Sequence, residues 1–185
     1  MSFRTTDLYG GAITVDLPLG FGDASNIRQI PDHQEVYLDA NGYSSIVFDI
    51  LERVEKSSDE EALQYHFQDL IDGTGDATNV LGQGTSVMAK VPNKPVYTLT
   101  YIQTPPTPTT APKRPIPDFV SIHLILLRLK EQGTDIVITV NVPHYPGEYV
   151  KVAEGEATQM MEDGETVKKR VLETFDVKDW GLFEG

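Results

Sequence analysis

The alternation of apolar and polar positions predicts a chain built mainly of β-strands. Several short segments have an apolar residue at every second position and are bounded by Pro, Gly, Asn or Asp, which is typical of strands. These predicted strands are Ala12–Leu17, Gln34–Leu38, Ile46–Leu51, Thr85–Val91, Val96–Gln103, Val120–Leu129 and Ile136–Val142. Short connections favour hairpins, the clearest of them across Glu131–Thr134 and another across Pro92–Pro95.

Two segments carry the period of an α-helix instead. Ser57 or Ser58 can cap the first helix, and an apolar stripe follows at Leu63, His66, Phe67, Leu70 and Ile71. The second helix is expected within Thr158–Phe175, although Gly164 weakens its first half.

These elements predict an α+β fold with a mostly antiparallel central sheet. Ile46–Leu51 is apolar at nearly every position, which suits a strand covered on both sides, so we expect helices on both faces of the sheet. The length of 185 residues and the composition suit a single domain spanning residues 1–185. Prolines at 104–117 block helix and sheet pairing and predict a surface loop there.

The formal net charge of −13 argues against nucleic acid or an anionic membrane as partner, because both require a basic face. Acidic residues are concentrated between Asp23 and Asp76, where they contribute a net −10. Such a region is either a solvated acidic face or a surface that attracts a basic protein. Composition alone leaves both interpretations open.

Motifs for bond-making chemistry are missing. The chain has no cysteine, and Gly20-Phe-Gly22 lacks the third glycine of a dinucleotide fingerprint. No Gly-Lys-Ser or Gly-Lys-Thr forms a phosphate loop, and Asp72–Asp76 lacks the rest of a calcium loop. The histidines have no metal-ligand spacing, and His66 and His123 are interpreted as core histidines. We therefore expect no cofactor, no metal and no enzymatic reaction.

The N-terminal region contains an unusual set of residues. Leu8-Tyr-Gly-Gly-Ala12 is followed by the Pro18-x-Gly-Phe stop, by Asp23-Ala-Ser25 and by Arg28-x-x-Pro31-Asp32-x-Gln34-Glu35-Val36-Tyr37. This series resembles the N-terminal signature of the Mog family, and the segment SSIVFDILE at 44–52 is similar to the strand that follows it there.

The resemblance to the Mog family implies a function. Its members bind the small GTPase Ran, release its guanine nucleotide and serve nuclear protein import. We therefore expect Ran as partner, with other nuclear transport factors as further candidates, and a location in nucleus and cytoplasm. Nothing in the sequence indicates an assembly larger than a monomer. The implied fold is an α/β/α sandwich shared with the extrinsic P-type subunit of photosystem. An accessory protein of that fold without a Ran interaction is the alternative, disfavoured because MSFRTTDLYGG contains no apolar signal region. A small-molecule-binding or hydrolytic domain is a third possibility.

The resemblance also indicates which residues contact Ran. The family's acidic pair corresponds to Asp49 and Glu52. Asp32 and Glu35 are expected beside them, whereas Arg28 and Gln34 belong either to the same contact or to the turn that Pro31 forms. Residues three apart in a regular strand face opposite sides, so a helix, a bulge or a strand end would be needed to place both acids on one face. The alternative is that Asp49 and Glu52 belong to a strand end that simply faces solvent.

Overall fold

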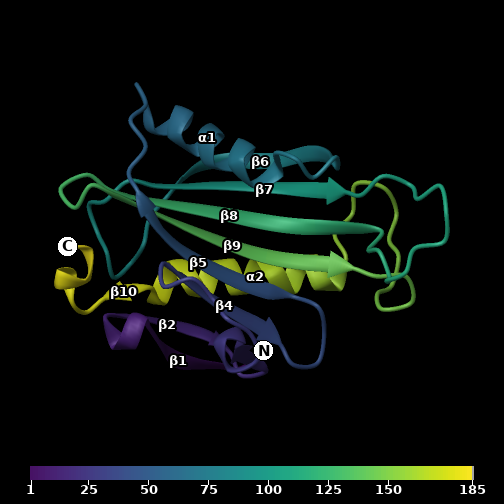
Figure 1. The fold of residues 1–185 in the computed structure, drawn as a ribbon, viewed down its shortest axis with the longest axis horizontal. Coiled ribbons are helices and arrows are strands. Elements are labelled where there is room, and N and C mark those ends of the chain that lie inside the picture. Colours follow the sequence, from purple (N-terminus) through teal and green to yellow (C-terminus); the bar gives the residue numbers. More distant parts are fainter. Residues whose placement is uncertain (185) are drawn as a thin grey trace.

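The structure, a computed structural model, describes residues 1–184 and contains two antiparallel sheets and two α-helices (Figure 1). The helices are α1 (Asp59–Ile71) and α2 (Gln159–Thr174). The strands are β1 (Phe3–Leu8), β2 (Ile13–Pro18), β3 (Phe21–Asp23), β4 (Gln34–Asp39), β5 (Ser45–Glu52), β6 (Ala77–Ser86), β7 (Val96–Thr104), β8 (Phe119–Leu129), β9 (Thr134–His144) and β10 (Asp176–Val177). Short 3₁₀ turns lie at Tyr9–Gly11, Ala24–Asn26 and Trp180–Phe183.

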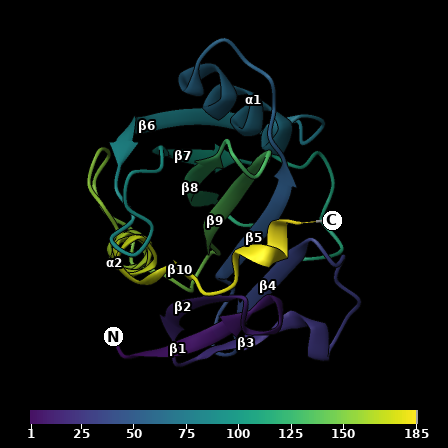
Figure 2. The same cartoon turned by 90° about the vertical axis from the view of Figure 1, so that its left-hand side faces the viewer.

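The larger sheet has the order β3-β4-β5-β9-β8-β7-β6, and the smaller has the order β1-β2-β10. Every strand pair is antiparallel. Figure 2 shows α1 and α2 on opposite sides of the larger sheet, with the smaller sheet packed beside α2. The predicted α+β fold, a mostly antiparallel sheet with helices on both faces, is therefore confirmed.

Each face of the larger sheet has its own apolar core. On the α1 side, Ala62, Leu63 and Phe67 pack against residues of β7, β8 and β9 such as Leu124 and Val137. The other core is larger, because α2 and the smaller sheet both contribute to it; its members include Ile13, Phe48, Ile138, Val171 and Phe175. The strands at the centre of the sheet are covered on both faces, which explains why they are continuously apolar.

Most predicted elements are confirmed to within a residue or two, but the strand predicted at Thr85–Val91 is wrong. β6 ends at Ser86, and residues 87–95 form a connection in which Asn93 has a φ of 66°. Met88 and Val91 leave the sheet to enter the core, and the Ala89 N–H donates to the carbonyl oxygen of Leu172. The apolar residues that predicted a strand thus belong to a loop that packs on α2.

The helix boundaries follow their caps. The Ser58 hydroxyl accepts from the Glu61 N–H at 3.2 Å, and the Thr158 hydroxyl accepts from the Met161 N–H at 3.0 Å. Gly164 has a packing reason, since a Cβ there would lie 3.0 Å from a methyl group of Val142. Within residues 1–184, neither helix has the length and apolar character needed to cross a membrane.

Phe175 tests how strongly the larger core holds the C-terminal elements to the sheet. Its ring is fully buried and stacks on Phe48, with 6.3 Å between ring centroids. Phe175→Ala should lower the free energy of unfolding by about 3–5 kcal/mol, because the cavity adds to the lost apolar burial. Urea unfolding measures the change, and Val150→Ala at an 83% exposed position is the control. Equal effects of the two substitutions would contradict this packing.

Candidate functional site

Asp49 lies on the face of the larger sheet that carries α1. The pairing of β5 with β9 is continuous from Ser45 to Glu52, so the strand has no bulge. Asp49 shares its face with Val47 and Leu51, and it is directly paired with Gln34 of β4. The structure therefore brings Asp49 and Gln34 together at the point where β4 begins.

The Asp49 carboxylate is partly desolvated and incompletely paired. Its side chain is 18% exposed, and one oxygen, Oδ2, accepts a hydrogen bond from Gln34 Nε2 at 3.2 Å. The other oxygen, Oδ1, is buried and has no hydrogen-bond partner within residues 1–184; His33 Nε2 lies 3.6 Å from it. Burial raises the pKa of Asp49, the charge of Asp69 raises it further, and Gln34 and His33 lower it. One oxygen of the Asp49 carboxylate is thus buried without a hydrogen bond to the described part of the chain.

The Leu-Tyr-Gly-Gly run explains how the strands near Asp49 are supported. Tyr9, Gly10 and Gly11 all have positive φ values of 52°, 67° and 94°, a conformation that is strained for tyrosine. The resulting turn directs the Tyr9 hydroxyl toward the carbonyl oxygens of His33 at 2.9 Å and Phe48 at 3.1 Å. Tyr9 thus supports the residues that immediately precede Gln34 and Asp49.

Glu35 connects the two sheets. Its Oε1 accepts a hydrogen bond of 2.7 Å from the Tyr9 N–H, and its burial raises its pKa. Because it alternates with Gln34 along β4, Glu35 points to the face opposite Asp49. The structure therefore places Glu35 in an internal contact, away from the patch in which we expected it.

The remaining predicted residues lie apart from Asp49. Glu52, at the exposed end of β5, is three residues from Asp49 and so projects from the opposite face. Arg28 and Asp32 are both exposed in the connection before β4, where Pro31 accepts from the Gln34 N–H and forms the predicted turn. His33, which is not among the predicted residues, stands inside the signature between Asp32 and Gln34 and lies beside Asp49.

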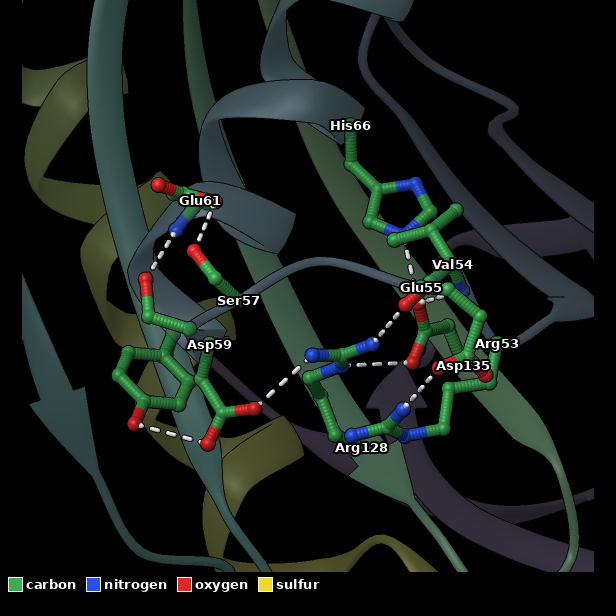
Figure 3. A network of polar contacts seen from close by, with 11 residues as sticks. Arg53, Val54, Glu55, Ser57, Asp59, Glu61, His66, Arg128 and Asp135 are labelled. Carbon is green, nitrogen blue, oxygen red and sulfur yellow. Dashed lines mark hydrogen bonds and ion pairs between the residues drawn. The ribbon is translucent and has the colours of Figure 1, made fainter.

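A buried polar network fixes α1 on the sheet beside this surface (Figure 3). Arg128 of β8 donates to Asp135 of β9 and to Asp59 at the start of α1, each at 2.9 Å, and to the Val54 carbonyl at 2.6 Å. The second Asp135 oxygen lies 2.8 Å from His66 Nε2 in the middle of α1. Helix α1 is therefore held at two points, and its C-terminal half, with Asp69, is placed near Asp49.

The ionisation of the network follows from its hydrogen bonds. Burial alone would raise the pKa of Asp135, but the bonds from His66 and Arg128 hold it below its ordinary value. Burial alone would lower the pKa of Arg128, whereas its bonds to Asp135 and Asp59 raise it. The interpretation of His66 as a core histidine is confirmed, since its side chain is 3% exposed and hydrogen-bonded.

Comparison with known proteins identifies the family. The model of the family described as Ran-interacting Mog1 protein matches residues 6–143. This chain belongs to the Mog1 family. It is 31% identical over 203 residues to the nuclear import protein MOG1 of Saccharomyces cerevisiae, covering 99% of this chain and 86% of that protein. It is 26% identical over 189 residues to the probable ran guanine nucleotide release factor of Dictyostelium discoideum, covering 98% of this chain and 97% of that protein.

A solved structure of a Mog1 family member has the same fold. The S. cerevisiae Ran-binding protein Mog1p superimposes with a TM-score of 0.80 at 30% identity, covering 99% of each chain. The residues matched by the Mog1 family model include the Tyr9 turn, the β4–β5 pair and α1. The match thus includes the residues that support the start of β4 and the middle of β5.

Asp135→Asn tests whether the network holds α1. The substitution removes the charge that pairs with Arg128, whose side chain is 1% exposed. We expect the free energy of unfolding to fall by about 3–5 kcal/mol, because a buried cation loses its partner. Chemical unfolding measures the loss. Glu131→Gln, which removes an exposed pair with Lys94, is the control and should change little; a small effect of Asp135→Asn would contradict the anchoring role.

Asp49→Asn tests whether the Asp49 carboxylate is maintained at the expense of stability. Because its folded-state pKa is raised, the ionised form is disfavoured in the folded chain. The wild type gains stability from Asp49 as the pH falls through this raised pKa toward the ordinary value of 3.8. The Asp49→Asn variant has no carboxyl group at this position and therefore lacks this gain. Asp49→Asn should thus match or exceed the stability of the wild type at neutral pH, with the difference shrinking toward about pH 4. Urea unfolding across this range checks the sign, and a variant less stable at neutral pH would overturn it.

Proposed function

We propose that this chain binds the small GTPase Ran and promotes release of its guanine nucleotide, in support of nuclear protein import. The proposal is supported by membership of the Mog1 family and by relatives named for nuclear import and for Ran nucleotide release. The observation that carries it is the Asp49 carboxylate, which is partly desolvated and has an unpaired oxygen on an acidic face. A basic surface on Ran complements that face.

Such a factor acts through binding linkage and makes or breaks no covalent bond. If it binds nucleotide-free Ran more tightly than loaded Ran, then nucleotide binds Ran more weakly in its presence by the same factor. The chain needs no catalytic residue for this activity. It needs a surface whose contacts are stronger when the nucleotide is absent.

Acidic side chains suit this task because they resemble the phosphates that they displace. In a GTPase, a lysine of the phosphate loop and a Mg²⁺ ion hold the nucleotide phosphates. A carboxylate placed beside that site competes for the lysine and disturbs the ion. Asp49 is the residue that we assign to this role, with Gln34 and His33 orienting it; Asp32 and Arg28 flank it on the exposed connection.

Glu35 and Glu52, which were also predicted to contact Ran, have different roles in this proposal. Glu35 holds the Tyr9 turn, and Glu52 lies at the rim of the contact, on the other face of β5. We further propose that the chain acts as a monomer and as a single domain, in both nucleus and cytoplasm.

Charge reversal at Asp49 provides the test. Mixed with Ran carrying a fluorescent guanine nucleotide, the wild-type chain should accelerate nucleotide loss. Asp49→Lys should weaken Ran binding by about 2–5 kcal/mol, because it leaves a partner cation unpaired at the interface. Glu52→Lys, at an exposed strand end, should mainly slow association. Stopped-flow fluorescence separates the two effects.

Glu60→Lys is the matched control, since Glu60 is an exposed acid in the first turn of α1. Circular dichroism establishes that each variant is folded. Unchanged nucleotide release in the presence of the wild-type chain would overturn the function. Normal release with folded Asp49→Lys would overturn the site and leave the function standing.

A further inference from the structure

Strand β6 is an unusually open edge of the larger sheet. It lies at the end of the strand order, next to β7 alone, and nine of its ten residues are exposed. Its sequence, ATNVLGQGTS, contains no charged residue and no proline, although the chain has 43 Lys, Arg, Asp or Glu among 185 residues. Natural sheets protect such edges with charges and prolines, which β6 lacks.

The backbone of β6 has a free side. Within residues 1–184, its backbone hydrogen bonds all belong to the ladder with β7. A register shift between Val80 and Gly82 leaves Leu81 at a bulge, with its side chain 51% exposed. The groups on the outer side are donors and acceptors for another strand.

One glycine of β6 is not explained by the fold itself. Gly82 stands at the register shift, where glycine is common, but Gly84 lies in the regular ladder with β7. Gly84 has no positive φ, and a Cβ there would meet nothing within 4 Å, so neither backbone conformation nor internal packing requires glycine at this position. Glycine inside a strand also marks places where another backbone approaches closely.

A groove of about 850 Å³ runs beside this edge on the α2 side of the sheet. Its apolar part includes Leu81, Ile102, Phe119 and Met161. Its polar rim carries three carboxylates, those of Asp118, Glu154 and Glu156, and one lysine, Lys151. On the opposite side, Gln64 of α1 donates to Gln83 of β6 at 2.9 Å, and Glu60 and Glu61 lie nearby.

We propose that the β6 edge binds an extended segment of a partner protein by strand addition, and that the segment alternates basic and apolar residues. Its backbone pairs with β6, and its apolar side chains enter the groove beside Leu81. Its basic side chains point to the other face of the sheet and meet Glu60 and Glu61 of α1 beside Gln83. Gly84 gives that backbone room to approach.

Charge decides between this partner and a second copy of the chain. Pairing β6 with β6 of another molecule would bring the acidic residues around two such edges together, each from a chain of net charge −13. A basic segment gains from the same acidic residues, because opposite charges across an interface attract and like charges repel.

The β6 edge is separate from the proposed Ran contact. β6 ends the larger sheet on one side, whereas β5 with Asp49 is separated from it by β9, β8 and β7. Figure 1 shows β6 beside α1 and β4 at the far side of the sheet. The inference therefore does not depend on Ran binding.

The test titrates the full chain, labelled with ¹⁵N, with a peptide of about eight residues that alternates Lys and Val, the length of a typical strand. Amide shifts should appear in residues 77–86 and around the groove. A peptide alternating Glu and Val should bind at least about tenfold more weakly, because like charges oppose it. N-methylation of alternate peptide amides should have a similar effect, since it removes the ladder hydrogen bonds.

Leu81→Lys should also reduce the affinity for the Lys–Val peptide by about tenfold, because it removes the apolar anchor and repels the ligand. Val87→Lys is the control, since Val87 lies one residue beyond β6 and is 70% exposed. Shifts confined to other regions, equal binding of the N-methylated peptide, or self-association through β6 in sedimentation experiments would each overturn the proposal.

Discussion

The arrangement of this chain depends on the buried ion pair between Arg128 and Asp135. Both side chains are almost fully excluded from water, and a charge in that position is tolerated only when its hydrogen bonds are complete. Val54, Asp59 and His66 complete them. Since Asp59 and His66 both belong to α1, the helix has one position on the sheet in which no buried charge is left unpaired. The network specifies where α1 lies, and the apolar contacts of Leu63 and Phe67 add stability there.

The position of α1 determines the surroundings of Asp49. The helix brings Asp69 and His66 close enough to affect the pKa of Asp49, and burial disfavours its ionised form. Asp49 contrasts with Asp135: both oxygens of Asp135 are hydrogen-bonded, whereas one oxygen of Asp49 is buried without a hydrogen bond to any residue that the structure describes. Asp135 holds α1 on the sheet, and Asp49 is the residue that we propose for the contact with Ran. Functional sites commonly keep such incompletely satisfied groups, which the rest of the structure must support.

The two ends of the larger sheet differ in their relation to partners. Near β4 and β5, side chains supply charge and hydrogen bonding, and the backbone is fully used in the ladder and by the Tyr9 hydroxyl. At β6 the side chains are uncharged and mostly exposed, and the outer side of the backbone makes no hydrogen bond within residues 1–184. In our two proposals, therefore, one surface of the same antiparallel sheet binds its partner through side chains and the other through main-chain pairing.

The sequence by itself determined the type of most elements, the antiparallel fold class and the family. Alternation and helical periodicity are local properties, and a signature such as Arg28-x-x-Pro31-Asp32-x-Gln34-Glu35 is visible without coordinates. The strand predicted from alternation was wrong at residues 87–91, where the apolar residues belong to a loop that packs on α2. Alternation indicates which residues are buried, but it does not indicate which backbone groups pair in a sheet. Only the tertiary structure decided that Glu35 faces Tyr9, that Glu52 projects away from Asp49, and that His66 and Asp135 meet across 69 residues. These outcomes depend on strand pleat, register and helix docking, which are set by contacts between residues far apart in the chain.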